Sequence, residues 1–337
     1  MKKVLLLIAA FVAGINSASA ISNNTVEVVY NGSTATVTIA PNISSYVTLM
    51  SGTSSHVVLM QAAGFAGVNI TTSNTSGEIT YVLSGSSDDG EFYLDGSFKC
   101  TVELNGLTLT NPSGPALNLQ NGKRVEVSAK NGTTNTLVDG ANDTYNGALH
   151  CKGHLKLKGK GTLNVTGNSK HGVYSKEYCE VKNLTLNILA AQKDGLHCKE
   201  YFLMESGALT IKGVQDDGIQ VEVGDPLAIT GTTTDHEDED SGNFYQEGGS
   251  ITISTGYTGK AVKADGTISL SSGTRNFTLA DCKENALADD ISDIRLADDG
   301  TVRLYDLNGR LLPTNTSLRP GLYLQKVGGV SRKVILK

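Results

Sequence analysis

The chain has 337 residues and a net charge of −6, with 38 glycines and no tryptophan. Only 18% of the residues are charged and 39% are hydrophobic, so Gly, Ser, Thr and Asn supply much of the remainder. This composition argues against long helices and favours many short strands joined by turns. The acidic balance argues against a general nucleic-acid binder.

Residues 1–20 have the pattern of a secretory signal peptide. Lys2 and Lys3 precede the apolar run VLLLIAAFVAGI, and NSASA ends in an A-x-A-like site, so we expect cleavage after Ala20. The apolar run is too short to span a bilayer comfortably, and no later segment resembles a transmembrane helix. The first cysteine is Cys100, which argues against a lipid anchor at the cleavage site. The sequence therefore predicts an exported protein without a transmembrane segment.

An internal repeat of about 23 residues follows a Ser/Thr/Asn-rich lead-in at 21–74, which we interpret as an N-terminal cap. The strings NGALHCK, KHGVYSK, KDGLHCK and DDGIQVE start 24, 23 and 23 residues apart, and GPALNLQ, GKAVKAD and ENALADD are degenerate copies. Each copy precedes a second alternating run, such as GTLNVTG. Two short strands cannot bury a face alone, but stacked copies can. Residues 75–290 are therefore predicted to form an all-β, right-handed parallel β-helix.

Stacking would align equivalent positions in columns about 4.8 Å apart. Alternation then predicts one inward column, formed by Leu117, Leu149, Val173, Leu196, Ile219, Val262 and Leu287. A second inward column includes Cys151 and Cys198, which would lie two coils apart and too far for a disulfide. The five cysteines have no C-x-x-C spacing and are interpreted as small core residues: Cys100, Cys151, Cys179, Cys198 and Cys282. A small residue recurs where each strand begins, at Ala148, Gly172, Gly195 and Gly218.

Two segments depart from the repeat. The period lengthens by about 20 residues after Gly218, which predicts a projecting loop at about 225–249 that contains the acidic run Asp235–Asp240. This run does not fit an EF-hand calcium loop, because Ser241 follows it and Gly249 stands where the last ligand should be. Residues 291–337 are basic and read as short strands around two turns, so they are predicted to form a separate small β module.

Residues 77–290 resemble a family of calcium-binding, pectate-lyase-like β-helix proteins that bind carbohydrate. The resemblance rests on ELNGLTLT, TNTLVDG, GALHCKGHLKLKGKGTLNVTGNSKHGVYSK, KDGLHCKE and DDGIQ. It implies a polysaccharide partner and acidic calcium ligands on neighbouring coils. The tail resembles the C-terminal sorting signal of type IX secretion substrates in Bacteroidetes, through YDLNGRLL, LRPGLY and RKVILK. That similarity implies type IX export, with release or attachment at the outer-membrane surface of a Gram-negative bacterium. A simple β-cap is the alternative for the tail.

Three carboxylates are expected to meet at one turn of the β-helix. Asp194 and Asp217 would occupy the same column on adjacent coils, with Asp216 beside them. Two such charges about 5 Å apart repel by roughly 3 kcal/mol at an effective dielectric of 20, so a proton, a lysine or a cation must offset them. Ca²⁺ accepts several oxygen ligands in irregular geometry and is the favoured cation. The alternative is that these residues only cap turns, with Lys170, Lys193 and Lys260 as counter-ions.

Two outward columns suggest a glycan-binding face. His150, Tyr174 and His197 would offer rings that stack on sugars, and Lys152, Lys176 and Lys199 would offer charges for uronate carboxylates. Ordinary solvent exposure is the alternative, because Glu177 and Glu200 could pair with the neighbouring lysines. Neutral glucans also stay open as ligands.

Three functions fit the sequence. The favoured one is non-catalytic, calcium-assisted binding of a polysaccharide such as polygalacturonate. The second is a calcium-dependent lyase, in which Lys260 would abstract the proton next to a calcium-bound uronate carboxylate. A lysine base needs a depressed pKa, which nearby carboxylates oppose. The third is a structural or adhesive surface solenoid.

Overall fold

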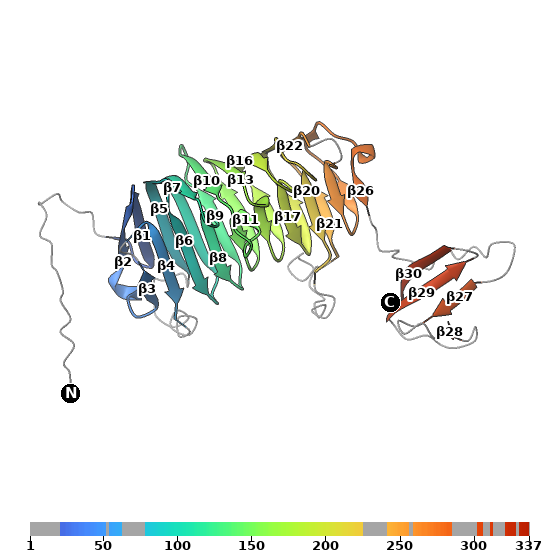
Figure 1. Cartoon of the computed structure of the whole chain (residues 1–337), viewed down its shortest axis with the longest axis horizontal. Coiled ribbons are helices and arrows are strands. Elements are labelled where there is room, and N and C mark those ends of the chain that lie inside the picture. The colour runs from blue at the N-terminus through green and yellow to red at the C-terminus, as the bar shows by residue number, and fades with distance from the viewer. Residues whose placement is uncertain are drawn as a thin grey trace, which may run out of the picture.

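The computed structural model describes residues 21–51, 54–62, 78–224, 241–255 and 259–284, together with strands at 302–305, 311–312, 321–327 and 330–336. Within these residues the protein is all-β, with two long, mainly parallel sheets and one small antiparallel sheet (Figure 1). The helical segments there are two 3-10 turns, η1 (Pro41–Ile43) and η3 (Leu279–Asp281). None of the described residues forms a helix able to cross a membrane. The expected signal peptide and the run Asp235–Asp240 lie outside the described residues.

The parallel strands follow three tracks, numbered in the order in which the chain visits them. Track one is the second sheet, with β4 (His56–Gln61), β6 (Glu91–Gly96), β8 (Leu117–Asn121), β11 (Gly147–Cys151), β14 (His171–Ser175), β17 (Leu196–Lys199), β20 (Ile219–Glu222), β23 (Val262–Ala264) and β26 (Lys283–Glu284). Track two holds β9 (Val125–Ala129), β12 (Leu155–Gly159), β15 (Cys179–Lys182), β18 (Tyr201–Met204), β21 (Asn243–Gln246) and β24 (Ile268–Leu270). Track three holds β10 (Thr134–Asp139), β13 (Thr162–Gly167), β16 (Leu184–Ala191), β19 (Gly207–Ile211), β22 (Ser250–Ile253) and β25 (Thr274–Arg275).

The pairing register explains the 23-residue period. β11 pairs in parallel with β14, β12 with β15, and β13 with β16, so the chain returns to the same track after every three strands. We call each set of three strands a rung. The long strand β7 (Cys100–Asn111) pairs with both β9 and β10, which joins tracks two and three into one sheet. The unit of the repeat is therefore three strands, one more than the two that the sequence indicated.

The predicted inward column is confirmed from Leu117 to Val262. Leu149 lies opposite Leu117 and Val173, and Leu196 lies opposite Val173 and Ile219. These side chains are buried. Four of the five cysteines are also buried, Cys282 is partly buried, and all five thiols are free.

The last copy of the repeat was placed wrongly. The sequence aligned Leu287 with Val262, but Lys283 lies opposite Lys263, which puts Cys282 at the level of Val262. The connection is shortened by η3, where the Thr278 backbone N–H and hydroxyl donate to the carboxylate of Asp281 and the Ala261 N–H donates to the Asp281 carbonyl. Leu287 itself lies outside the described residues.

The recurring small residue marks a close approach between tracks one and three. A Cβ added to Gly195 would lie 2.5 Å from Cγ2 of Ile211, and one added to Gly218 would lie 2.5 Å from Cγ2 of Ile253. Real side chains do not approach this closely, so a larger residue would push the rung open. The glycine at the start of each rung therefore leaves room for the isoleucine in the third strand of the same rung.

Antiparallel strands stand at the N-terminal end of the stack. β1 (Thr25–Asn31) pairs in parallel with β5 (Ile79–Ser87) and antiparallel with β2 (Thr34–Ile39). β3 (Val47–Ser51) pairs antiparallel with β4. The lead-in therefore joins the parallel sheets directly and ends them with strands of opposite direction.

The range 225–249, predicted as a loop, contains a strand among its described residues. β21 lies inside that range, pairs with β18 and β24, and places Phe244 against Phe202 with ring centroids 5.1 Å apart. The sequence missed this strand because the extra residues obscured its register. In the C-terminal segment, β27 (Val302–Tyr305), β28 (Leu311–Leu312), β29 (Gly321–Val327) and β30 (Val330–Leu336) form an antiparallel sheet of their own, consistent with the predicted β strands.

Candidate functional site

One column lies just before the track-one strands and contains Asp194 and Asp217. The backbone N–H of Asp217 donates to Oδ1 of Asp194 at 3.1 Å, and the N–H of Lys260 donates to Oδ1 of Asp217 at 2.8 Å. Both aspartates are almost fully buried. Each carboxylate thus accepts the backbone N–H of the equivalent residue on the next rung. These contacts agree with the turn-capping role that the sequence left open.

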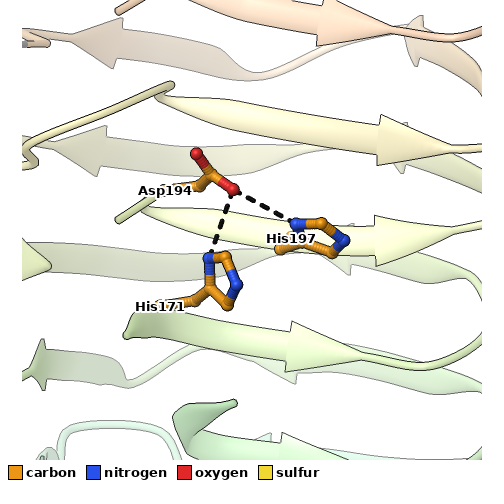
Figure 2. A group of neighbouring side chains, drawn as sticks. All are labelled: His171, Asp194 and His197. Carbon is orange, nitrogen blue, oxygen red and sulfur yellow. Dashed lines mark hydrogen bonds and ion pairs between the residues drawn. The ribbon is translucent and has the colours of Figure 1, made fainter. Parts of the chain in front are cut away.

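Asp194 also connects two imidazoles (Figure 2). Its Oδ2 lies 3.2 Å from Nδ1 of His171 and 3.1 Å from Nδ1 of His197. Burial opposes the charged carboxylate, yet its contacts with both rings hold the pKa of Asp194 well below its usual value. Burial lowers the pKa of His171, whereas Asp194 and Glu222 outweigh burial and raise that of His197. Of the two histidines, His197 is therefore the one that is protonated more readily.

The three predicted carboxylates do meet. Oxygen atoms of Asp194, Asp216 and Asp217 lie within 4.8 Å of one another, and Asp216 is the exposed member. Its pKa is raised by partial burial and by the charges of Asp217 and Asp194. Asp217 has its own counter-ion, since Nζ of Lys263 lies 3.3 Å from its Oδ2. The repulsion expected from the sequence is thus present, and Lys263 offsets part of it.

Within the cluster of Asp194, Asp216 and Asp217, some carboxylate oxygens are better placed than others to bind a calcium ion. Both oxygens of Asp194 and Oδ1 of Asp217 already accept hydrogen bonds. Oxygen atoms of Asp216 and Asp217 lie within 4.8 Å of each other, and these two carboxylates could bind Ca²⁺, with water or a ligand completing its shell. Lys263 would have to swing away from Asp217. Sequence reasoning missed this lysine, although GKAVKAD aligns it with His197 and Gln220.

The predicted ring column is present, but two of its rings are buried. Tyr174 stacks against His150 at 5.1 Å and against His197 at 5.5 Å, and both histidines are less than one-tenth exposed. The sequence predicts exposed flat rings here, but rings one rung apart stack on one another and both histidines are buried. Burial, with a smaller contribution from Lys170, lowers the pKa of His150 to about 4. His150 is thus neutral at pH 7, and its Nδ1 accepts the N–H of Asn146.

The predicted lysines differ in their surroundings. Lys152 and Lys176 are exposed. The sequence suggested that Lys199 pairs with Glu200. In the structure Nζ of Lys199 lies 3.6 Å from Oε2 of Glu222. Lys260 contributes its backbone to Asp217, but the lysine side chain at that carboxylate is Lys263. Lys152 and Lys176 are therefore the better candidates for contacting an acidic ligand.

A second cluster lies after the track-one strands. Nε2 of His154 is 2.9 Å from Oε2 of Glu177 and 3.4 Å from Oε2 of Glu200. Burial opposes protonation, but both carboxylates raise the pKa of His154 to about 9. Sequence reasoning missed this cluster, although the three residues are spaced by 23 and 23 positions. The 23-residue spacing that predicts contact between Asp194 and Asp217 also predicts this cluster.

Track two carries a charged groove on its surface. A cavity of about 490 Å³ is lined by Lys156, Lys158, Glu180, Lys182 and Glu205, among others. Lys156 pairs with Glu180, Lys158 with Glu126 and Lys182 with Glu205. Because each of these three lysines pairs with a glutamate, their charges largely cancel.

These features define a repetitive all-β protein with ladders of polar side chains along its surface. A family model described as "Carbohydrate-binding domain-containing protein" matches residues 66–302, and the chain belongs to this family. Among solved structures, the gadolinium derivative of a polysaccharide lyase-like protein from C. thermocellum matches with a TM-score of 0.55 and 18% identity. The match covers 78% of this chain and 95% of that chain, and at this identity it shows a shared fold alone. No curated protein matches.

Proposed function

We propose that this protein binds a polysaccharide outside the cell without cleaving it, and that calcium assists the binding. Membership in a carbohydrate-binding family and the fold shared with a polysaccharide lyase-like protein support the glycan partner. We also propose that the three tracks form a right-handed parallel β-helix, because each strand pairs in parallel with the strand three positions later. The signal-peptide pattern and the tail resembling a type IX sorting signal support export to the outer-membrane surface.

The cluster of Asp194, Asp216 and Asp217 carries the calcium proposal. Asp216 is exposed, has a raised pKa and has an oxygen within 4.8 Å of one from Asp217, so a divalent cation there would relieve repulsion between carboxylates. A calcium ion held by only two or three protein carboxylates keeps sites for ligand oxygens. This arrangement suits an acidic glycan such as polygalacturonate, whose carboxylates would complete the shell.

Binding is favoured over cleavage because of the lysine at the cluster. A lysine base must lose its proton near neutral pH, which requires a lowered pKa. Partial burial does oppose the charge on Lys263, but Asp217, Asp194 and Asp216 outweigh it and raise the pKa of Lys263. Lys263 is therefore suited to be the counter-ion of Asp217 and not a base.

A glycan-binding screen in calcium and in chelator tests the proposal. We expect acidic glycans to bind in calcium, and binding to weaken in chelator and in Asp216→Asn. Asp88→Asn, which removes an exposed carboxylate far along the chain, is the matched control. Unsaturated, ultraviolet-absorbing products from pectate would select the lyase instead. Absence of any glycan binding, with or without calcium, would leave the structural or adhesive role.

A further inference from the structure

One column outside the aspartate cluster carries a mixed nitrogen and oxygen donor set. His154 precedes β12, Glu177 precedes β15 with one residue between, and Glu200 directly precedes β18, so the three lie on consecutive rungs at the corner between tracks one and two. Asp194 precedes β17 whereas Glu200 follows it, which places the two clusters at opposite ends of the same strand. One ligand atom from each of the three residues lies within 4.8 Å of the others.

The donors of this column are held in place. The imidazole of His154 stacks on the ring of Tyr178, with centroids 4.2 Å apart and planes 8° apart. Oε2 of Glu200 accepts the backbone N–H of Tyr178 at 3.2 Å, and Glu200 itself has a left-handed backbone with φ of 62°. The side chains are 27%, 29% and 18% exposed for His154, Glu177 and Glu200, so an ion in solution can reach a partly desolvated site.

The distances suit a small cation with tetrahedral preference. Donor atoms about 2.1 Å from a tetrahedral zinc ion are about 3.4 Å from one another. Nε2 of His154 lies 2.9 Å and 3.4 Å from the two glutamate oxygens. An imidazole nitrogen selects for zinc, copper or nickel over calcium and magnesium, and two carboxylates balance a charge of +2. We propose that His154, Glu177 and Glu200 bind a divalent cation of the zinc class, with its fourth position open to water or a ligand.

Another histidine with two acidic neighbours provides a matched control. Nε2 of His56 lies 3.1 Å from Asp89, but it is Nδ1 that lies 3.7 Å from Glu91. The two carboxylates therefore face different nitrogens of the ring and cannot share one ion with it. The buried trio of His171, Asp194 and His197 is the competing location, and the test must separate it from His154.

Calorimetric titration of zinc into the purified full-length protein tests this proposal. The protein carries no polyhistidine tag, is stripped of metal, and is kept in excess calcium so that zinc reports only on sites that prefer it. We expect wild type to bind one equivalent, and His154→Gln to lose it. Glu177→Gln and Glu200→Gln should each weaken binding at least tenfold, while His56→Gln binds as wild type does.

Several outcomes would overturn the proposal. Absence of zinc binding by wild type, unchanged binding by His154→Gln, or loss of binding in Asp194→Asn alone would each do so. Thermal unfolding of every variant without metal shows whether it folds, and zinc should raise the melting temperature of wild type and His56→Gln but not of His154→Gln. These readouts contain no glycan, so their failure leaves the proposed carbohydrate function untouched.

Discussion

Asp194 and Asp217 are joined by a hydrogen bond from the backbone N–H of Asp217 to Oδ1 of Asp194, although 23 residues separate them. Oδ2 of the same Asp194 carboxylate accepts a hydrogen bond from Nδ1 of His197 and lies 3.2 Å from Nδ1 of His171. A side chain first considered as a metal ligand is thus also a connection between rungs. Because only Asp194 has this structural role, its replacement should affect the stability of the fold differently from replacement of the exposed Asp216.

Replacing Asp194 should destabilise the fold more than replacing Asp216. Asp194→Asn keeps the shape but removes the charge paired with His197 in a buried site, so we expect a loss of roughly 1–3 kcal/mol in the free energy of unfolding. Asp216→Asn is exposed and should change it by less than about 0.5 kcal/mol. Urea unfolding followed by circular dichroism measures both. Equal effects would contradict the asymmetry described for the cluster.

Removing the counter-ion should strengthen calcium binding. Lys263→Gln takes away a positive charge 3.3 Å from Oδ2 of Asp217, so calcium affinity should rise by on the order of tenfold at low salt. Calorimetry with calcium measures the change, and Lys212→Gln, at an exposed lysine, is the control. Weaker calcium binding in Lys263→Gln would place the ion elsewhere.

The ring column should contribute to glycan binding through ring edges. Tyr174→Phe keeps the stack between His150 and His197 but removes the hydroxyl, so stability should stay within about 0.5 kcal/mol while glycan affinity falls roughly three- to tenfold. Tyr174→Leu also removes the stack and should cost about 1–2 kcal/mol of stability. Affinity electrophoresis and thermal melts provide the two measurements. Unchanged affinity in Tyr174→Phe would exclude this edge contact.

A methyl group at the rung corner should be costly. Gly195→Ala places a Cβ 2.5 Å from Ile211 and 2.8 Å from the carbonyl oxygen of Gly218, so we expect a loss of roughly 1–3 kcal/mol. Gly122→Ala meets no heavy atom within 4 Å and should be nearly neutral. Chemical unfolding compares the two, and equal stability would show that the rungs relax freely.

Asp139 should make stability depend on pH. Burial raises the pKa of this carboxyl, at the end of β10, to about 6 from an ordinary value of 3.8. The folded state then binds the proton more tightly than the unfolded state, so the free energy of unfolding falls as pH rises between about 4 and 6. Asp139→Asn should remove up to roughly 1–3 kcal/mol of that fall. Unfolding curves at several pH values measure it, with Asp143→Asn as the exposed control.

The period of the sequence predicted which residues are neighbours between rungs. It placed Leu149, Val173 and Leu196 in one column and brought Asp194 to Asp217, because pairing register depends only on spacing along the chain. It misplaced Leu287, since a 3-10 turn shortens the last connection without any marked change in composition. Local turn geometry of this kind leaves little trace in an alternating pattern.

Burial and charge pairing were harder to predict than adjacency. Strand alternation assigned His150 and His197 to the outside, but stacking on Tyr174 covers them. Lys263 and the column of His154, Glu177 and Glu200 follow the same spacing, but no distinctive local motif such as Asp-Gly marks them. Whether neighbouring side chains pair, stack or compete depends on rotamers, which spacing does not specify.

The three-strand rung has a consequence for how such a protein can change. Because each rung contacts its neighbours through the same register, a whole rung can be duplicated or deleted while every remaining column stays continuous. Duplicating residues 193–215 would add one more aspartate, one more histidine and two more glutamates, each in its own column. The length of every column is therefore set by the number of rungs, so the surface can lengthen without any new arrangement of residues within a rung.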